Sequence, residues 1–150
     1  MTADRIERET VIAAPVERVW SVLTEAEHLA RWFAETGAEI DLRPGGELLL
    51  HWKAMPTARG RVEVVEPPRR FAYRWTAHYD TGAEPAEGNS TRVEFTLTPE
   101  GESTRLRVVE TGFASLATSE ERSSGNHSAN VRGWRSKIDA LAAYATGIAP

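Results

Sequence analysis

Residues 93–110 read VEFTLTPEGESTRLRVVE, which is two alternating runs of apolar and polar residues joined by a short polar segment. Alternation with a period of two is typical of β-strands that bury one face. The joining segment Pro99-Glu100-Gly101-Glu102 contains residues that favour a tight turn. The stretch therefore predicts an antiparallel hairpin with one apolar face.

The same period of two extends from this hairpin back to Gly37. Segments 43–46 and 66–69 are short and rich in glycine and proline, so they suit hairpin turns, whereas 77–90 is long enough for a flexible surface loop. With Ile6–Ile12 as an edge strand, we expect a curved seven-stranded sheet containing a six-stranded antiparallel meander. The alternating apolar positions are Ile40/Leu42, Leu48/Leu50/Trp52, Val62/Val64, Phe71/Tyr73/Trp75, Val93/Phe95/Leu97 and Leu106/Val108.

Helical periodicity occurs on both sides of this region. After Pro15, apolar residues recur at helical spacing, and Thr24 with Glu27 predicts a capping box for a second short helix that ends before Gly37. A long C-terminal helix is predicted to follow a capping box at Thr118 and to end at Gly147. Its apolar stripe consists of His127, Val131, Trp134, Ile138, Leu141 and Ala145.

The order of these elements predicts an α+β protein of the helix-grip type, with one domain spanning residues 1–150. A sheet with one apolar face needs a cover, and the C-terminal helix is the only long element with a matching stripe. A twisted sheet bent around one helix diverges from it at one end. We therefore expect a central cavity between the sheet and this helix, roofed by the two short helices.

Composition and charge exclude several classes of function. The formal net charge is −4 and the basic residues are interleaved with acidic ones, so we expect no nucleic-acid partner. The absence of cysteine excludes disulfides and thiolate chemistry and fits a reducing, cytoplasmic location. No run approaches the roughly 18 apolar residues of a membrane span, so we expect no membrane partner.

The sequence predicts neither a metal site nor a cofactor. The histidines His28, His51, His78 and His127 are scattered, without a His-x-x-x-His or His/carboxylate spacing that would place two ligands on one face. No Gly-x-Ser-x-Gly motif or phosphate-binding glycine loop is present. Hydrolase and nucleotide-dependent activities therefore lack support.

Several segments resemble one known superfamily. Ile12–Trp20 and Leu29–Phe33 are similar to the START/SRPBCC (helix-grip, Bet v-like) superfamily. Gly60–Phe71, Glu110–Phe113 and the pair Gly133-Trp134 resemble its branch named for activators of the heat-shock-protein-90 ATPase. The resemblance spans nearly the whole chain in the expected order. It implies the helix-grip fold and ligand binding in the central cavity.

Inward-facing aromatic and polar residues are the candidate site. Glu110 continues the inward parity of Val108, so its carboxyl group should face the cavity, with Asn130 or His127 across from it on the helix. Alternatively, Glu110 lies at the rim, where it is solvated or paired with an arginine. A buried unpaired carboxylate is costly, so Glu110→Gln is expected to raise stability if no cation is present. The predicted ligand-binding residues are Trp32, Trp52, Trp75, Phe95, Glu110, Phe113, His127, Asn130, Trp134 and Ile138.

Three functions stay open from the sequence. The first is the binding of a small apolar or aromatic molecule, which we favour because it needs no reactive group. The second is a cofactor-independent enzyme of the cyclase or dehydratase type, in which Glu110 would transfer protons. The third is an interaction module for a chaperone or regulator, with a protein partner or a second copy of the chain.

Overall fold

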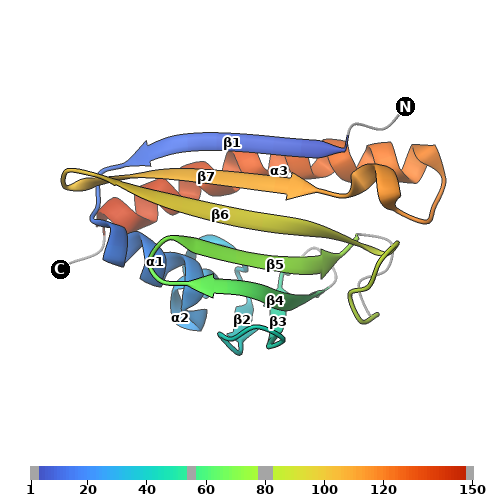
Figure 1. The fold of residues 1–150 in the computed structure, drawn as a ribbon, viewed down its shortest axis with the longest axis horizontal. Coiled ribbons are helices and arrows are strands. Elements are labelled where there is room, and N and C mark those ends of the chain that lie inside the picture. Colours follow the sequence, from blue (N-terminus) through green and yellow to red (C-terminus); the bar gives the residue numbers. More distant parts are fainter. Residues whose placement is uncertain (1–3, 54–56, 78–82, 148–150) are drawn as a thin grey trace.

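The computed structural model describes residues 4–53, 57–77 and 83–147. Its elements follow the order strand, two helices, six strands and a long helix (Figure 1). The strands are β1 Arg5–Ile12, β2 Gly37–Ile40, β3 Glu47–His51, β4 Ala58–Glu66, β5 Arg70–Thr76, β6 Ser90–Glu100 and β7 Ser103–Thr111. The helices are α1 Val16–Thr24, α2 Ala26–Trp32 and α3 Glu120–Gly147, and a 3-10 turn spans Phe113–Ser115.

All seven strands form one antiparallel sheet in the order β1-β7-β6-β5-β4-β3-β2. This order confirms the predicted meander, with β1 added beside β7. Tyr73 lies opposite Val93, and Val93 lies opposite Glu110. Directly opposed residues in an antiparallel sheet point to the same face. These three side chains therefore form one row on the inner face.

The turn after β2 explains why the predicted alternation ends at Ile40. The chain folds back so tightly that a Cβ atom on Gly46 would lie 1.9 Å from the carbonyl oxygen of Asp41. Leu42 lies in this turn and is exposed, so its predicted inward position is wrong. The predicted long loop joins β5 to β6, and its residues 78–82, with His78 among them, lie outside the described residues.

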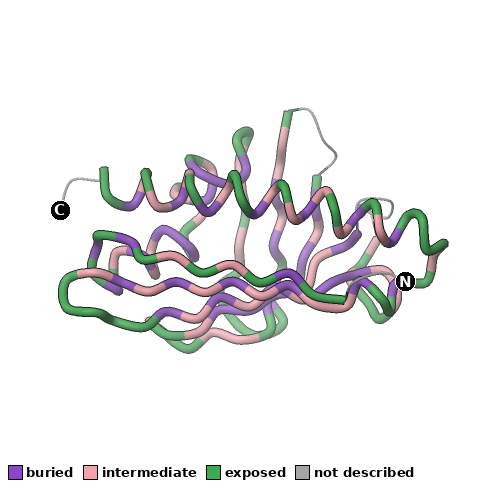
Figure 2. The backbone as a smooth tube through the Cα atoms, turned by 90° about the horizontal axis from the view of Figure 1, so that it is seen from above, coloured by how far each residue is buried: buried purple, intermediate pink, exposed green. Residues whose placement is uncertain are grey.

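Helix α3 lies across the inner face of the sheet, and its buried positions face the strands (Figure 2). Its stripe differs from the predicted one in the first half. His127 and Val131 are only half-buried, whereas Asn126 and Asn130 are buried. The reason is that this half of α3 lies over polar groups, since the Ser123 hydroxyl donates to the Phe113 carbonyl at 2.5 Å.

Neither predicted capping box is found at the start of its helix. Thr24 is the last residue of α1, and its hydroxyl donates to the Trp20 carbonyl at 2.8 Å instead of capping α2. For α3, the Ser119 hydroxyl accepts a hydrogen bond from the Arg122 backbone N–H at 3.2 Å, so the helix begins one residue later than predicted. Helix α3 then runs without interruption to Gly147, the predicted end.

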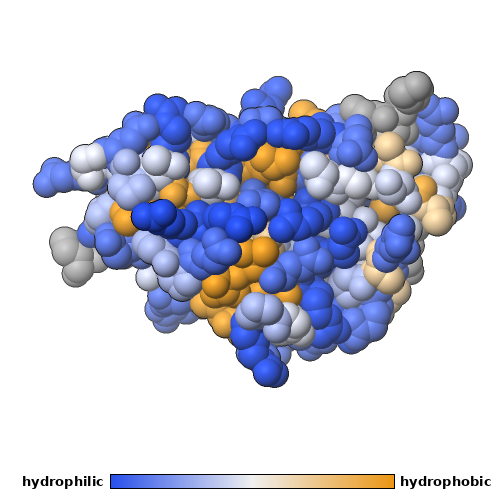
Figure 3. Space-filling model, in the orientation of Figure 1, coloured by the Kyte–Doolittle hydropathy of each residue, from blue (hydrophilic) through white to orange (hydrophobic). Residues whose placement is uncertain are grey.

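The outer face of the sheet is covered by charged side chains, and Figure 3 shows this face as largely hydrophilic with smaller apolar areas. Arg92 pairs with Glu63 at 2.8 Å and with Glu94 at 2.7 Å, and Arg70 pairs with Glu94 at 2.9 Å. Such partly exposed pairs stabilise a protein only modestly, but they keep this face hydrated. An apolar site is therefore expected on the inner face of the sheet. Within the described residues, no helix has both the length and the hydropathy to span a membrane.

Candidate functional site

The side chain of Glu110 lies on the inner face of β7 and is fully buried, with 0% exposure. Its Oε2 accepts hydrogen bonds from the Trp75 indole at 2.8 Å and the Thr91 hydroxyl at 2.5 Å. Its Oε1 accepts one from the Trp134 indole at 2.8 Å, and the Asn130 amide lies 3.0 Å from both oxygens. The predicted inward direction and the Asn130 contact are confirmed, and the rim alternative is wrong.

The Glu110 network consists of a carboxylate and neutral donors. Indole N–H groups can only donate, and an ionised carboxylate can only accept, so the two kinds of group are complementary. Among the described residues, every hydrogen-bond partner of Glu110 is an uncharged side chain. Because its oxygens are all engaged, Glu110 joins β5, β6 and β7 to α3 as a structural centre.

Other predicted site residues lie away from this network. The His127 ring nitrogen Nε2 lies 3.1 Å from the Arg5 carbonyl, and the His127 ring packs edge-on against Phe113 with 5.0 Å between centroids. The Trp52 indole donates to the Phe33 carbonyl at 2.7 Å. Ile138 is buried further along α3. The predicted set is therefore spread over several parts of the inner face.

A small cavity of about 10 Å³ lies between the two short helices and the sheet. That volume holds roughly one water molecule. Of the predicted ligand-binding residues, Trp32 and Phe95 line it, and no described residue of α3 does. The cavity therefore lies toward α1 and α2 rather than beneath the C-terminal helix. Its lining consists of Leu23, Leu29, Trp32, Phe33, Leu48, Leu50, Phe71, Tyr73 and Phe95.

Aromatic rings fill the space between α3 and the sheet where the cavity was expected. The Trp134 ring packs against Phe33, Trp75 and Phe95, with centroid distances of 5.6, 5.9 and 5.7 Å. Phe33 follows the last residue of α2 and inserts among the rings of Trp52, which follows β3, Trp75 of β5 and Trp134 of α3. Phe33 therefore lies between the aromatic packing beneath α3 and the cavity near the short helices, whose wall it also forms.

Tyr73 is the cavity residue that the sequence analysis missed as a site residue. It is 1% exposed, and its hydroxyl has no hydrogen-bond partner among the described residues. The only other polar side-chain group in the lining is the Trp32 indole, which donates to the Val22 carbonyl at 2.8 Å. Burial, and next the nearby charge of Glu110, raise the pKa of Tyr73 well above its ordinary value of 10.0. The hydroxyl is therefore a neutral, buried donor without a side-chain or backbone partner among the described residues.

Tyr73→Phe is expected to raise the free energy of unfolding by about 1 kcal/mol at pH 7, because it removes a buried polar group that has no partner. The pKa of Tyr73 is raised in the folded state, so the unfolded chain ionises this group first as pH rises above about 10. Ionisation of the unfolded chain favours unfolding, so stability falls in this pH range. The wild type should therefore lose stability relative to Tyr73→Phe above about pH 10. Urea unfolding of both proteins at neutral and alkaline pH measures this difference.

Tyr144→Phe is the matched control for that comparison. The Tyr144 hydroxyl lies 2.7 Å from Nδ1 of His28, so its removal breaks a hydrogen bond. We expect this variant to lose about 1 kcal/mol at pH 7. A loss of similar size in Tyr73→Phe would show that the Tyr73 hydroxyl already has a partner in the folded protein.

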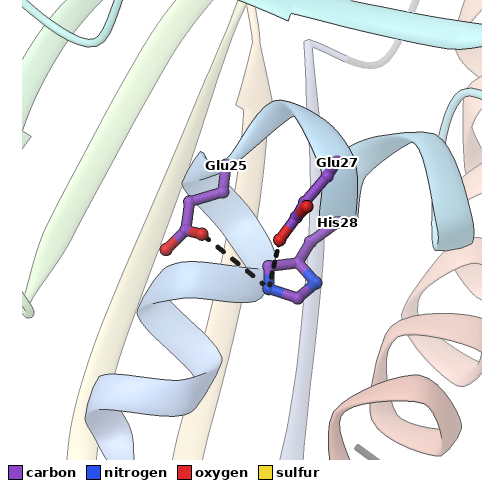
Figure 4. A group of neighbouring side chains, drawn as sticks. All are labelled: Glu25, Glu27 and His28. Carbon is purple, nitrogen blue, oxygen red and sulfur yellow. Dashed lines mark ion pairs between the residues drawn. The ribbon is translucent and has the colours of Figure 1, made fainter.

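A second group of polar side chains lies at the start of α2 (Figure 4). Nε2 of His28 lies 3.9 Å from Glu25 and 4.0 Å from Glu27, and possible ligand atoms of all three residues lie within 4.8 Å of one another. The spacing Glu-x-Glu-His brings them together, which the sequence analysis overlooked. Both carboxylates are more than half exposed. Exposed groups of this kind form weak ion pairs, and no buried ligand completes a metal site here among the described residues.

A curved antiparallel sheet that holds one long C-terminal helix, with a cavity roofed by two short helices, defines a helix-grip protein. The sequence model of the family described as "Activator of Hsp90 ATPase homolog 1-like protein" matches residues 13–146. The chain belongs to this family, as its sequence resemblance predicted. No match to a curated protein sequence reaches significance.

Solved structures share the fold over almost the whole chain. Protein MLL2253 from Mesorhizobium loti is 20% identical with a TM-score of 0.79, covering 97% of this chain and 99% of that one. The crystal structure of CalU16 from Micromonospora echinospora is 27% identical with a TM-score of 0.68, covering 95% and 76%. PFC0360w, an HSP90 activator from Plasmodium falciparum, is 18% identical with a TM-score of 0.75, covering 93% and 94%. At 18–20% identity, the first and third similarities show the fold alone.

Proposed function

We propose that this protein binds a small apolar or aromatic molecule in the cavity between α1, α2 and the sheet. The observation that carries the proposal is the cavity lining, which is apolar and aromatic. Ligand pockets are typically lined mainly by hydrophobic and aromatic side chains of this kind. This makes the cavity the best-supported site on the inner face.

The two short helices give the cavity a way to widen. Helices α1 and α2 have 9 and 7 residues, and neither has a side-chain hydrogen bond at its N-cap. Helices of this length depend on tertiary packing for their stability. Their packing onto the sheet uses the residues that surround the cavity, including Leu23, Leu29 and Trp32. A ligand that replaces these contacts can therefore move the helices outward at modest cost.

The geometry favours binding over the catalytic alternative. A general base must reach its substrate within hydrogen-bond distance. The oxygens of Glu110 already accept from four side chains, and Glu110 is absent from the cavity lining. The structure offers no specific observation that favours the chaperone or regulator alternative.

The planar hydrocarbon α-methylstyrene is a suitable probe, because it fits an apolar site without requiring a polar contact. Binding to the folded state should raise the melting temperature progressively with probe concentration. In protein with 13C-labelled leucine methyl groups, we expect the largest shift changes at Leu23, Leu29, Leu48 and Leu50. These four residues line the cavity.

Leu116 and Leu141 provide internal controls in the same spectra. Both are buried, but neither lines the cavity. Changes confined to these two methyl pairs would place the binding site elsewhere in the core. No change in melting temperature or in any leucine methyl group at saturating probe would contradict the proposed function.

A further inference from the structure

We infer that Thr57 is a nucleophile that accepts acyl groups from activated esters, with His51 as its general base and Glu39 as the residue that positions His51. These three side chains lie on the outer face of the sheet, whereas the proposed ligand cavity lies on the inner face. The inference is therefore independent of the proposed function.

Strand register brings the three side chains together. His51 is the last residue of β3 and pairs with β2, where Glu39 lies two residues beyond its partner. On the other side of β3, Leu50 pairs with Ala58, so Thr57 lies opposite His51. Leu50 and Ala58 are buried on the inner face, and successive residues of a strand point to opposite faces. His51, Glu39 and Thr57 therefore share the outer face.

Two hydrogen bonds connect these side chains in series. Nδ1 of His51 lies 2.9 Å from the Thr57 hydroxyl oxygen, and Nε2 of His51 lies 3.2 Å from Oε2 of Glu39. An ionised carboxylate can only accept, so Nε2 of the neutral imidazole carries the hydrogen and Nδ1 is left as an acceptor. The Thr57 hydroxyl must then donate to Nδ1. In this arrangement a histidine can take the proton of a hydroxyl nucleophile.

The histidine ring is held in place while the hydroxyl is accessible. The His51 side chain is only 33% exposed, and its ring lies beside Gly37, where an added Cβ atom would be 3.8 Å from Cδ2 of the ring. Hydrogen bonds at both ring nitrogens fix its orientation further. Thr57 is exposed. A small acyl donor can therefore reach the hydroxyl from solvent without entering the core.

The reaction transfers the acyl group of an activated ester to the Thr57 oxygen. This oxygen attacks the ester carbonyl as its proton passes to Nδ1 of His51, and Glu39 stabilises the imidazolium that forms. When the tetrahedral intermediate collapses, the bond to the leaving group breaks and the proton passes from His51 to the leaving oxygen. The products are an ester of Thr57 and a free alcohol, so the step is balanced without a further reactant.

Reaction with p-nitrophenyl acetate tests the nucleophile and its base. We expect an acetyl group on Thr57, located by mass spectrometry of peptides, and a burst of p-nitrophenolate that Thr57→Val lacks. His51→Ala should slow acetylation of Thr57 about 100-fold. Added imidazole should restore part of this rate, because it can replace the missing base.

Glu39→Gln tests the positioning role. The glutamine NH2 group can donate to Nε2, which favours the tautomer with its hydrogen on Nδ1, so the Thr57 hydroxyl loses its acceptor. Acetylation of Thr57 should become roughly 10-fold slower or more. Acetylation of Lys137, on α3, should keep its wild-type rate in the same samples and serves as the reference for reagent.

Two results would overturn the inference. One is acetylation of Thr57 in His51→Ala at the wild-type rate, which would show that no base assists the hydroxyl. The other is acetylation of lysine side chains without acetylation of Thr57 in the wild type. Saturating α-methylstyrene should leave the rate at Thr57 unchanged, so this inference and the proposed function stand or fail separately. The melting temperatures of the variants should stay close to that of the wild type, because surface substitutions change stability little.

Discussion

Glu110→Gln is expected to lower the free energy of unfolding by about 1–3 kcal/mol. The glutamine NH2 group must take the place of one carboxylate oxygen. At Oε2 it would face the donors of Trp75 and Thr91, and at Oε1 it would face those of Trp134 and Asn130. At Oε1 the amide would oppose the Trp134 indole N–H, and at Oε2 it would oppose the Trp75 indole N–H, whose only other acceptor among the described residues is the Thr91 hydroxyl at 3.1 Å.

This expected loss reverses the gain that the sequence alone suggested. The gain assumed a carboxylate without partners, for which neutralisation would remove only a desolvation cost. The structure instead surrounds Glu110 with four donor side chains. Complementary hydrogen bonds in a water-excluded site favour the acceptor-only group. The amide therefore loses more than it gains.

Glu102→Gln is the matched control, because it makes the same substitution at an exposed position just before β7. It should leave stability almost unchanged. Urea unfolding at pH 7 compares both variants with the wild type. Equal or greater stability of Glu110→Gln would show that the donors around Glu110 can rearrange to accept an amide.

The fold was predictable because apolar residues recur every second position in the strands and at helical spacing in the helices. Alternation located all six strands after Gly37, and the stripe from Trp134 to Ala145 identified the helix that covers them. The direction of Glu110 followed from parity alone, since it lies two residues after Val108 on the same strand. Local patterns of this kind depend on neighbours in the chain, which the sequence shows directly.

The cavity was not predictable in its correct place, because side-chain filling depends on residues far apart in the chain. Phe33, at the end of α2, packs against Trp75 of β5 and Trp134 of α3. No sequence period reports this contact. The polar stripe of α3 was missed for a similar reason, since the partner of the buried Asn130 is Glu110, which lies 20 residues earlier in the chain. The inward position of the Tyr73 hydroxyl could have been recognised from the alternation in its strand. Its lack of a hydrogen-bond partner could not, because that depends on distant residues.

Trp134→Ala is expected to lower the free energy of unfolding by about 3–5 kcal/mol, because the indole is 2% exposed and lies at the centre of the aromatic packing. Its removal leaves Phe33, Trp75 and Phe95 without the ring that they pack against. It also removes the donor to Oε1 of Glu110. Packing and hydrogen bonding are therefore lost together.

Trp134→Phe separates these two contributions, since it keeps an aromatic ring and removes the indole N–H. We expect about half of the loss seen in Trp134→Ala, because one hydrogen bond to a buried charged group is removed and part of the packing is retained. Arg135→Ala, at the next and exposed position of α3, should have little effect. Thermal and urea unfolding of the three variants measure these differences. If Trp134→Ala unfolds with the midpoint of the wild type, α3 does not depend on Trp134 to hold the sheet, and the Glu110 network is not the centre that joins them.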